Sequence, residues 1–299
     1  MVNWWLIKAW EKKSAMAGQI NELAPPESKT GLAKRLSVSR GSLYYRPKLP
    51  AKDLALKAKI EQVMVVNKSY GHRRIACELK INHKRVRRVM KLFNLVVKRK
   101  RQKPFKPKDC KQAPMIIPNL VLGLIIDAPW QVWASDFTYL PYFGRFVYLA
   151  TVEDVFTRQV VGWSVGIKHC SDLVAYALID AMGNYTAPKI IHSDQGAEYR
   201  SEDYLNLVKS LGIKPSMSAK ASPWQNGYQE SFYSGFKLEL GHPEIYPTLG
   251  ELVEAIAQQI YYYNHQRIHT ALKCPPEIFA QRYLLTNKLA NQILVRQVV

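Results

Sequence analysis

The chain has 299 residues and carries 43 Lys and Arg against 23 Asp and Glu, a formal net charge of +20 with a sequence pI near 9.7. Such a charge predicts a polyanionic partner. Hydrophobic residues make up 47% of the chain. This is enough for packed cores in roughly two domains of ~150 residues each, and it excludes wholesale disorder. The longest apolar run, Leu120 to Ile126, is much shorter than the ~20 residues of a bilayer span, so we expect neither a membrane protein nor a membrane partner.

The N-terminus and the cysteines indicate the compartment. Residues 1–10 lack the pattern of a secretory signal, so we expect a cytoplasmic location. Cys77, Cys110, Cys170 and Cys274 lie far apart, without a Cys-x-x-Cys pair or a histidine pair at zinc spacing. We therefore expect reduced thiols and no structural zinc.

The positive charge is concentrated in the first part of the chain. Up to Pro118 there are 29 Lys and Arg against 7 Asp and Glu, whereas beyond it there are 14 against 16. This asymmetry predicts an N-terminal region that binds nucleic acid, joined to a near-neutral domain whose acidic residues have a chemical role. A solvated basic surface is the alternative.

Short helices are predicted throughout the basic part. Residues 30–45 resemble two helices about a turn, a helix-turn-helix pattern that an ordinary helical hairpin also matches. Further helices are predicted over 54–66, from Tyr70 onward, and over 83–93, where Asn82 is a candidate N-cap. The last of these has one apolar face and one cationic face. Candidate DNA contacts in this region are Arg73, Arg74, Lys84, Arg85, Arg87 and Arg88.

A basic, proline-containing linker follows over residues 97–126. Residues 98–108 carry seven cations and no anion, and Pro104 and Pro107 favour an extended chain. We expect this run to contact DNA, with a solvated linker as the alternative. The candidate contacts are Lys98, Arg99, Lys100 and Arg101.

The second half has the pattern of an α/β domain. Strands are predicted over 130–139, 145–152 and 159–165, then a helix over 172–183, a strand over 189–192 and a helix over 202–211. This order predicts a mixed sheet flanked by helices.

Two aspartates occupy unusual positions, one within and one just after these strands. Asp136 interrupts an otherwise apolar strand, where an unpaired carboxylate is costly and requires a cation or a metal ion. Asp194 follows the strand over 189–192 in His192-Ser-Asp-Gln-Gly196, where an ordinary Asp-containing turn is the alternative.

A third acidic residue lies on a predicted helix over 227–240. Glu230 is in its first turn, and Lys237 follows seven residues later, two helical turns along the same face. Tyr228, Phe232 and Phe236 are predicted to form the apolar stripe. A surface ion-pair stripe is the alternative for the charged face.

The spacing between the second and third acids is the most specific signal, with 35 residues between Asp194 and Glu230. Together with Asp136 and the motifs around all three, it resembles the DDE transposases and integrases, specifically the catalytic subunit of the insertion sequence three family. The resemblance covers roughly residues 30–284. Its motifs are Trp133-Ala-Ser-Asp136-Phe-Thr-Tyr139, His192-Ser-Asp194-Gln-Gly-Ala-Glu198-Tyr199, Asn226-Gly-Tyr-Gln-Glu230-Ser-Phe232 and Tyr263-Asn-His-Gln-Arg267-Ile-His-Thr-Ala-Leu272.

The resemblance implies a ribonuclease H-like catalytic core over 127–284 in which Asp136, Asp194 and Glu230 converge. These carboxylates would hold two Mg²⁺ ions, for which Mn²⁺ substitutes, and support DNA 3′-end cleavage and strand transfer. The remaining divisions expected are an N-terminal extension over 1–28, a helical region over 29–96, the linker and a tail over 285–299. Lys237 is implied to contact DNA phosphate, and Lys220, Arg267 and His192 are further candidates for DNA contact.

The implied partners are double-stranded DNA at the element ends and the target, at least one further copy of the chain, and the product of an upstream reading frame. The implied location is the bacterial nucleoid. Two other functions remain open: a catalytically silent, domesticated DNA-binding regulator, and a nuclease that only hydrolyses nucleic acid.

Overall fold

The computed structural model describes residues 28–35, 37, 39–41, 49–97, 117–218 and 227–297. The chain falls into two compact units, one of residues 1–66 with 70–98 and one of residues 67–69 with 99–299. Most of the second helix expected in the helix-turn-helix pattern lies outside the described residues. So do five of the candidate DNA contacts, Lys98, Arg99, Lys100, Arg101 and Lys220.

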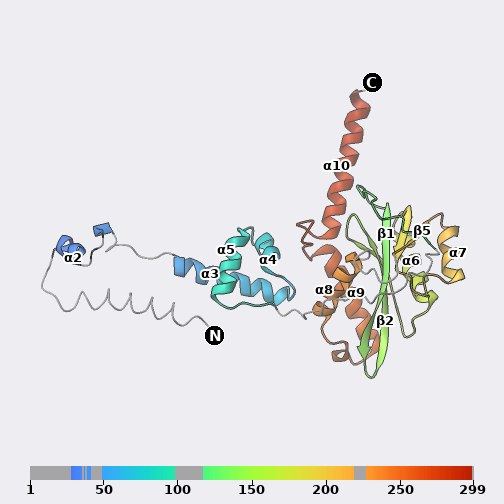
Figure 1. Ribbon diagram of the computed structural model, residues 1–299, viewed down its shortest axis with the longest axis horizontal. Helices are drawn as coiled ribbons and strands as arrows, with labels where there is room; N and C mark the ends of the chain where they lie inside the picture. Colours follow the sequence, from blue (N-terminus) through green and yellow to red (C-terminus); the bar gives the residue numbers. More distant parts are fainter. Residues whose placement is uncertain are drawn as a thin grey trace. The chain divides into compact units, whose positions relative to one another are not determined.

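The described part of the first unit is helical, as expected. The predicted N-cap of its last helix is confirmed, because the Asn82 side chain accepts a hydrogen bond of 2.9 Å from the backbone N–H of Lys84. Val86 and Val89 lie on the inner face of that helix and are fully buried. The helices are α2 (Lys29–Arg35), α3 (Leu49–Val66), α4 (His72–Glu78) and α5 (His83–Leu92), drawn in blue to cyan in Figure 1.

A five-stranded mixed sheet forms the centre of the second unit, in the order β3-β2-β1-β4-β5. The central strand β1 pairs antiparallel with β2 and parallel with β4. The expected α/β class with a mixed sheet is confirmed, and β5 is a strand that the sequence pattern did not reveal. The strands are β1 (Val132–Tyr142), β2 (Arg145–Asp154), β3 (Val160–Gly166), β4 (Ile190–Ser193) and β5 (Lys214–Met217).

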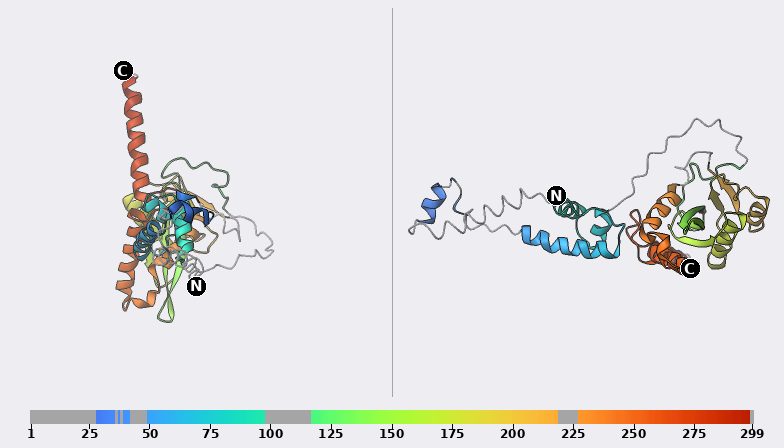
Figure 2. Two further views of the ribbon diagram at one scale, coloured as in Figure 1. Left: turned by 90° about the vertical axis from the view of Figure 1, so that its left-hand side faces the viewer. Right: turned by 90° about the horizontal axis from the view of Figure 1, so that it is seen from below.

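Helices cover both faces of this sheet (Figures 1 and 2). On one face, α6 (Ser171–Asn184) and α7 (Glu202–Ser210) bury a core built around Trp133. On the other face, α8 (Gly227–Leu240) and α9 (Leu249–His265) bury a second core that contains Leu149. The faces alternate along each strand because successive side chains point to opposite sides of a sheet. The result is a three-layered unit.

The last helix, α10 (Pro276–Gln297), continues through the expected domain boundary at residue 284 and runs out from the three layers in Figure 1. Within the part of the chain that the structure describes, no helix combines the length and apolar character of a membrane span.

Residues 117–126 pack on the second unit, although the sequence places them in the linker. Ile117 lies against the core under α6, and Val121 and Ile126 pack against a small cluster at the start of β1. The backbone N–H of Leu120 donates to Ser216 Oγ at 2.8 Å. These apolar contacts explain the difference, because a stretch of Val, Leu and Ile is stabilised by covering a core.

Gly162 on β3 allows α6 to approach the sheet closely. A Cβ atom at this position would lie 2.3 Å from the carbonyl oxygen of Ala177 and 2.6 Å from Cβ of Ala181. Real Cβ atoms do not make such contacts, so the helix backbone rests directly on the strand.

Two side chains bond to the backbone of β3 from neighbouring helices. Asn264 of α9 accepts a hydrogen bond from Val160 N–H at 3.0 Å and donates one to Val160 C=O at 2.8 Å. Asp180 of α6 accepts one from Trp163 N–H at 3.0 Å.

Candidate active site

The parallel pairing of β1 and β4 places Asp136 and Asp194 at corresponding positions along neighbouring strands. β1 pairs with β4 as far as Ala134 opposite His192. Two residues further along, Asp136 is still on β1, while Asp194 lies just beyond the carboxyl end of β4. The Asp194 side chain is exposed, and its Oδ1 accepts a hydrogen bond from Gly196 N–H at 2.9 Å.

Glu230 comes from α8, whose bounds match the predicted helix. Phe232 and Phe236 are buried as expected. Tyr228 is not buried, and the prediction that it belongs to the apolar stripe is wrong. The residue is 41% exposed, and its ring centroid lies 3.9 Å from the guanidinium carbon of Arg158. The side chain of Glu230 itself is exposed.

The electrostatics of Asp136 link the predicted residues. The pKa of Asp136 is raised from 3.8 to about 7, first by burial and also by the negative charges of Asp194 and Glu230, while the Phe137 N–H bond and Lys237 oppose the shift. Lys237 also lies with Nζ 4.8 Å from the ring centroid of Tyr139 on β1. Asp194, Glu230 and Lys237 therefore all lie close enough to Asp136 to influence its pKa.

The region around Asp136 has the donor chemistry of a divalent-cation site. Three carboxylates supply hard oxygen donors of the kind that Mg²⁺ prefers, and their mutual repulsion is relieved by a cation. Among the described residues, no three His, Cys, Asp or Glu side chains are drawn together closely enough to hold a metal ion as they stand. Residues 219–226, which lead into α8, are not described.

Gln229 and Tyr233 fasten α8 to β1 beside these carboxylates. Gln229 Nε2 donates to the backbone carbonyl of Ala134 at 2.7 Å, and the Tyr233 hydroxyl donates to that of Asp136 at 2.7 Å. The buried hydroxyl of Thr151 on β2 lies 3.0 Å from Gln229 Oε1 and 2.8 Å from the Tyr233 oxygen. We call these three side chains the α8 clamp.

The α8 clamp holds Glu230 in place, since Glu230 directly follows Gln229. Sequence reasoning missed it. The available signal was a pair of polar side chains four residues apart, Gln229 and Tyr233, on the face of α8 that also carries Phe232 and Phe236.

His192 and Arg267, both expected as DNA contacts, have other roles in the structure. His192 is 3% exposed, and its Nδ1 lies 2.9 Å from Ser216 Oγ on the neighbouring strand. Arg267 Nε donates to Glu239 at 2.8 Å, and both side chains are 6% exposed. Because burial removes both from the surface, we correct these two interpretations: the residues support packing.

The cations of the first unit differ in their surroundings. Arg88 forms an ion pair of 2.5 Å with buried Asp53, and the guanidinium of Arg74 lies 5.7 Å from the ring centroid of Tyr70. The other candidate DNA contacts of this unit that the structure describes are exposed: Arg73, Lys84, Arg85 and Arg87.

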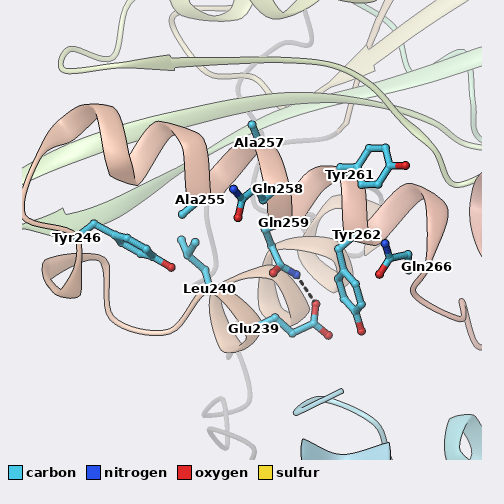
Figure 3. A pocket seen from close by; sticks show the side chains of 10 residues that line it. All are labelled: Glu239, Leu240, Tyr246, Ala255, Ala257, Gln258, Gln259, Tyr261, Tyr262 and Gln266. Atoms are coloured by element: carbon cyan, nitrogen blue, oxygen red, sulfur yellow. Dashed lines mark hydrogen bonds between the residues drawn. The ribbon is translucent and has the colours of Figure 1, made fainter. Parts of the chain in front are cut away.

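A surface hollow of about 760 Å³ lies between α8 and α9 (Figure 3). Its lining includes Glu239, Tyr262 and Gln259, whose amide donates to Glu239 at 2.8 Å. None of the three carboxylates lines it. The hollow is therefore a separate feature from the acidic site.

Comparison with known proteins decides the family. Residues 127–223 and 211–276 each match a family described as integrase core domain. The transposase for insertion sequence element IS904 from Lactococcus lactis is 37% identical over 64% of this chain and 77% of its own length. The InsK protein of IS150 from Escherichia coli is 30% identical over 89% of this chain and 98% of its own length. The chain belongs to the insertion sequence three family of transposases.

This transposase is accordingly a polynucleotidyl transferase of the DDE class with an integrase core. A further relative, InsF of IS3A from Escherichia coli, is 38% identical over 39% of this chain and 41% of its own length. Among solved structures, the catalytic core domain of HTLV-2 integrase in complex with magnesium is similar over 51% of this chain and 97% of that domain, with 21% identity and a TM-score of 0.41.

Proposed function

We propose that this transposase cleaves DNA at the 3′ ends of its element and joins them to target DNA, with Asp136, Asp194 and Glu230 as metal ligands. One observation carries the proposal: the pKa of Asp136 is raised by burial and by the charges of Asp194 and Glu230, so carboxylates from two other parts of the fold act on Asp136. Such an excess of negative charge is costly to a fold unless a cation is bound there.

The oxygen donors of these residues suit magnesium, and two such ions would supply Lewis-acid stabilisation to phosphodiester cleavage and joining. Manganese, with similar oxygen preference, is expected to substitute. The chain's own part is positional. β1 and β4 hold the two aspartates, the α8 clamp holds Glu230, and Lys237 binds a DNA phosphate beside them.

Double-stranded DNA and further copies of the chain follow as partners. Two element ends must meet for integration, so at least a dimer forms on DNA. The exposed cations of α4 and α5 and the basic run over 98–108 provide the affinity for the backbone, and an upstream-frame product joins the complex as fusion or partner.

The test is strand joining on a branched DNA that already places a 3′-hydroxyl beside a phosphodiester, with Mg²⁺ or Mn²⁺. We expect joining by the wild type and by Glu254→Gln, a matched change at an exposed position on α9, and none by Glu230→Gln. Each of Asp136→Asn and Asp194→Asn is expected to abolish joining while DNA affinity is retained.

The other outcomes refute the proposal in different ways. Hydrolysis without joining would indicate a nuclease. Binding without any reaction, with and without the upstream-frame product, would indicate a catalytically silent regulator.

A further inference from the structure

A histidine and a glutamate that the proposed reaction does not use are joined beside the acidic site. His169 lies in the loop between β3 and α6, and Glu198 lies in the turn that follows Asp194. His169 Nδ1 is 2.6 Å from Glu198 Oε1. The glutamate side chain is 9% exposed and the histidine side chain 54% exposed, so a buried carboxylate holds an accessible imidazole.

Aromatic contacts fix the plane of this imidazole. Its ring stacks on Phe137 of β1, with centroids 5.9 Å apart and planes 10° apart, and it also contacts Tyr148 of β2 at 5.3 Å. Since Nδ1 is engaged by Glu198, the polar atom of His169 that remains for a ligand is Nε2. The imidazole ring of His169 is therefore preorganised. Preorganisation reduces the conformational entropy that is lost when a ligand binds.

The pair lies near both of the aspartates proposed as metal ligands. Phe137, under the imidazole, directly follows Asp136, and its N–H bonds to Asp136 Oδ1 at 2.8 Å. At the second aspartate, a Cβ atom at Gly196 would lie 2.8 Å from Glu198 Oε2 and 3.0 Å from Asp194 Oδ1. Glu198 and Asp194 therefore flank the same point of the turn.

We propose that His169 binds a DNA phosphate next to the reacting phosphodiester and that Glu198 is its positioning residue; this inference rests on the proposed function for its substrate. With Glu198 at Nδ1 and a phosphate oxygen at Nε2, the imidazole carries a proton on both nitrogens. The resulting single positive charge lies between two anions. Charge-assisted hydrogen bonds of this type are stronger than neutral ones.

The salt dependence of DNA binding tests this contact, because a residue with only a structural role does not release counterions. We would measure DNA affinity without divalent metal at a constant pH of about 6. The slope of log affinity against log salt is negative. In His169→Gln its magnitude should be smaller by about 0.9, the value for one phosphate contact on a duplex. His169→Lys should restore the slope, and Glu198→Gln should weaken binding less than His169→Gln does.

The matched control is His265→Gln, because His265 is also exposed and its Nδ1 is also bonded, here to the Tyr261 carbonyl at 3.0 Å. Its slope should equal that of the wild type. In the joining assay, His169→Gln should raise the KM for DNA by about tenfold, equivalent to the loss of one charge-assisted contact.

An unchanged slope and KM in His169→Gln, whatever the change in thermal midpoint, would overturn the inference and reduce the pair to a tie between two loops. His169→Asn provides the same comparison if the glutamine variant does not fold. The binding measurement is independent of catalysis. A wild type that binds but does not join would therefore refute the proposed function while the salt slope still decides the role of His169.

Discussion

Replacing Gln229 with alanine tests whether the α8 clamp positions Glu230. The Gln229 side chain is fully buried, and its loss leaves the carbonyl of Ala134 without its 2.7 Å partner, whereas Thr151 keeps the Tyr233 hydroxyl at 2.8 Å. Loss of this buried hydrogen bond costs about 0.5–1.5 kcal/mol, and the cavity left by the side chain adds about 1–2 kcal/mol. We expect the free energy of unfolding to fall by about 1.5–3.5 kcal/mol, an appreciable share of the roughly 5–15 kcal/mol typical of a domain.

Activity should fall more than this loss of stability explains. A displacement of about 1 Å in a catalytic group can reduce a rate by about 100-fold, and Glu230 is covalently next to the altered residue. The assays are urea unfolding and strand joining at saturating DNA. Gln229→Met preserves the volume and removes the hydrogen bonds, so it separates the two contributions to stability.

The matched control is Gln258→Ala, because Gln258 is exposed on α9 and its amide donates to the exposed Glu254. It should change unfolding by less than about 0.5 kcal/mol, as surface substitutions usually do. The reasoning would be refuted if Gln229→Ala matched this control in unfolding, or if it were destabilised and yet joined DNA at the wild-type rate at a temperature where it is folded.

Three further predictions concern charge and packing. Burial raises the pKa of Glu153 from 4.5 to about 8, so the folded state binds this proton more tightly and stability should fall as pH rises between these values. Urea unfolding of Glu153→Gln across this range should show a flatter pH dependence. Gly162→Ala should destabilise by about 3 kcal/mol through overlap with α6, whereas Gly183→Ala, whose methyl group meets nothing within 4 Å, should stabilise by up to ~1 kcal/mol in the same measurement. Asp136→Asn should raise the thermal midpoint in metal-free buffer by removing carboxylate repulsion, and Mg²⁺ should then raise the midpoint of the wild type but not of the variant; an equal response of both would contradict its role as a ligand.

Local signals predicted most of the elements. α8 was placed at its observed bounds because Gly241, with a φ of +82°, and Pro243 end a helix clearly. β1 runs beyond the predicted end at Tyr139, because a hairpin turn at Phe143 and Gly144 pairs Tyr142 with Arg145. Such pairing depends on the partner strand.

Other elements gave weaker signals. β5 has only four residues, one of them proline, and it is a strand because β4 pairs with it in parallel. α9 was not predicted, although Thr248 followed by Glu251 is a capping box whose hydrogen bond the structure contains at 3.2 Å.

Some residues of the candidate site could be predicted from the sequence, and others could not. Residue type and spacing were enough to select Asp136, Asp194 and Glu230, because carboxylates in apolar or turn contexts are conspicuous in a sequence. Burial is not visible there, so the sequence offers His192 and Arg267 as candidates for DNA contact although both are buried. The α8 clamp likewise depends on which backbone carbonyls Gln229 and Tyr233 face, and this is fixed only when α8 packs on β1.

The bonds from Asn264 and Asp180 to β3 bear on how copies of this protein can assemble. β3 is an outer strand of the sheet, and an outer strand offers its free peptide groups to any other extended chain. Asn264 occupies both groups of Val160, and Asp180 occupies the N–H of Trp163. Two side chains thus replace a missing sixth strand at these positions and block growth of the sheet into a neighbouring molecule. Copies of this protein are therefore expected to associate through surfaces other than these positions of β3.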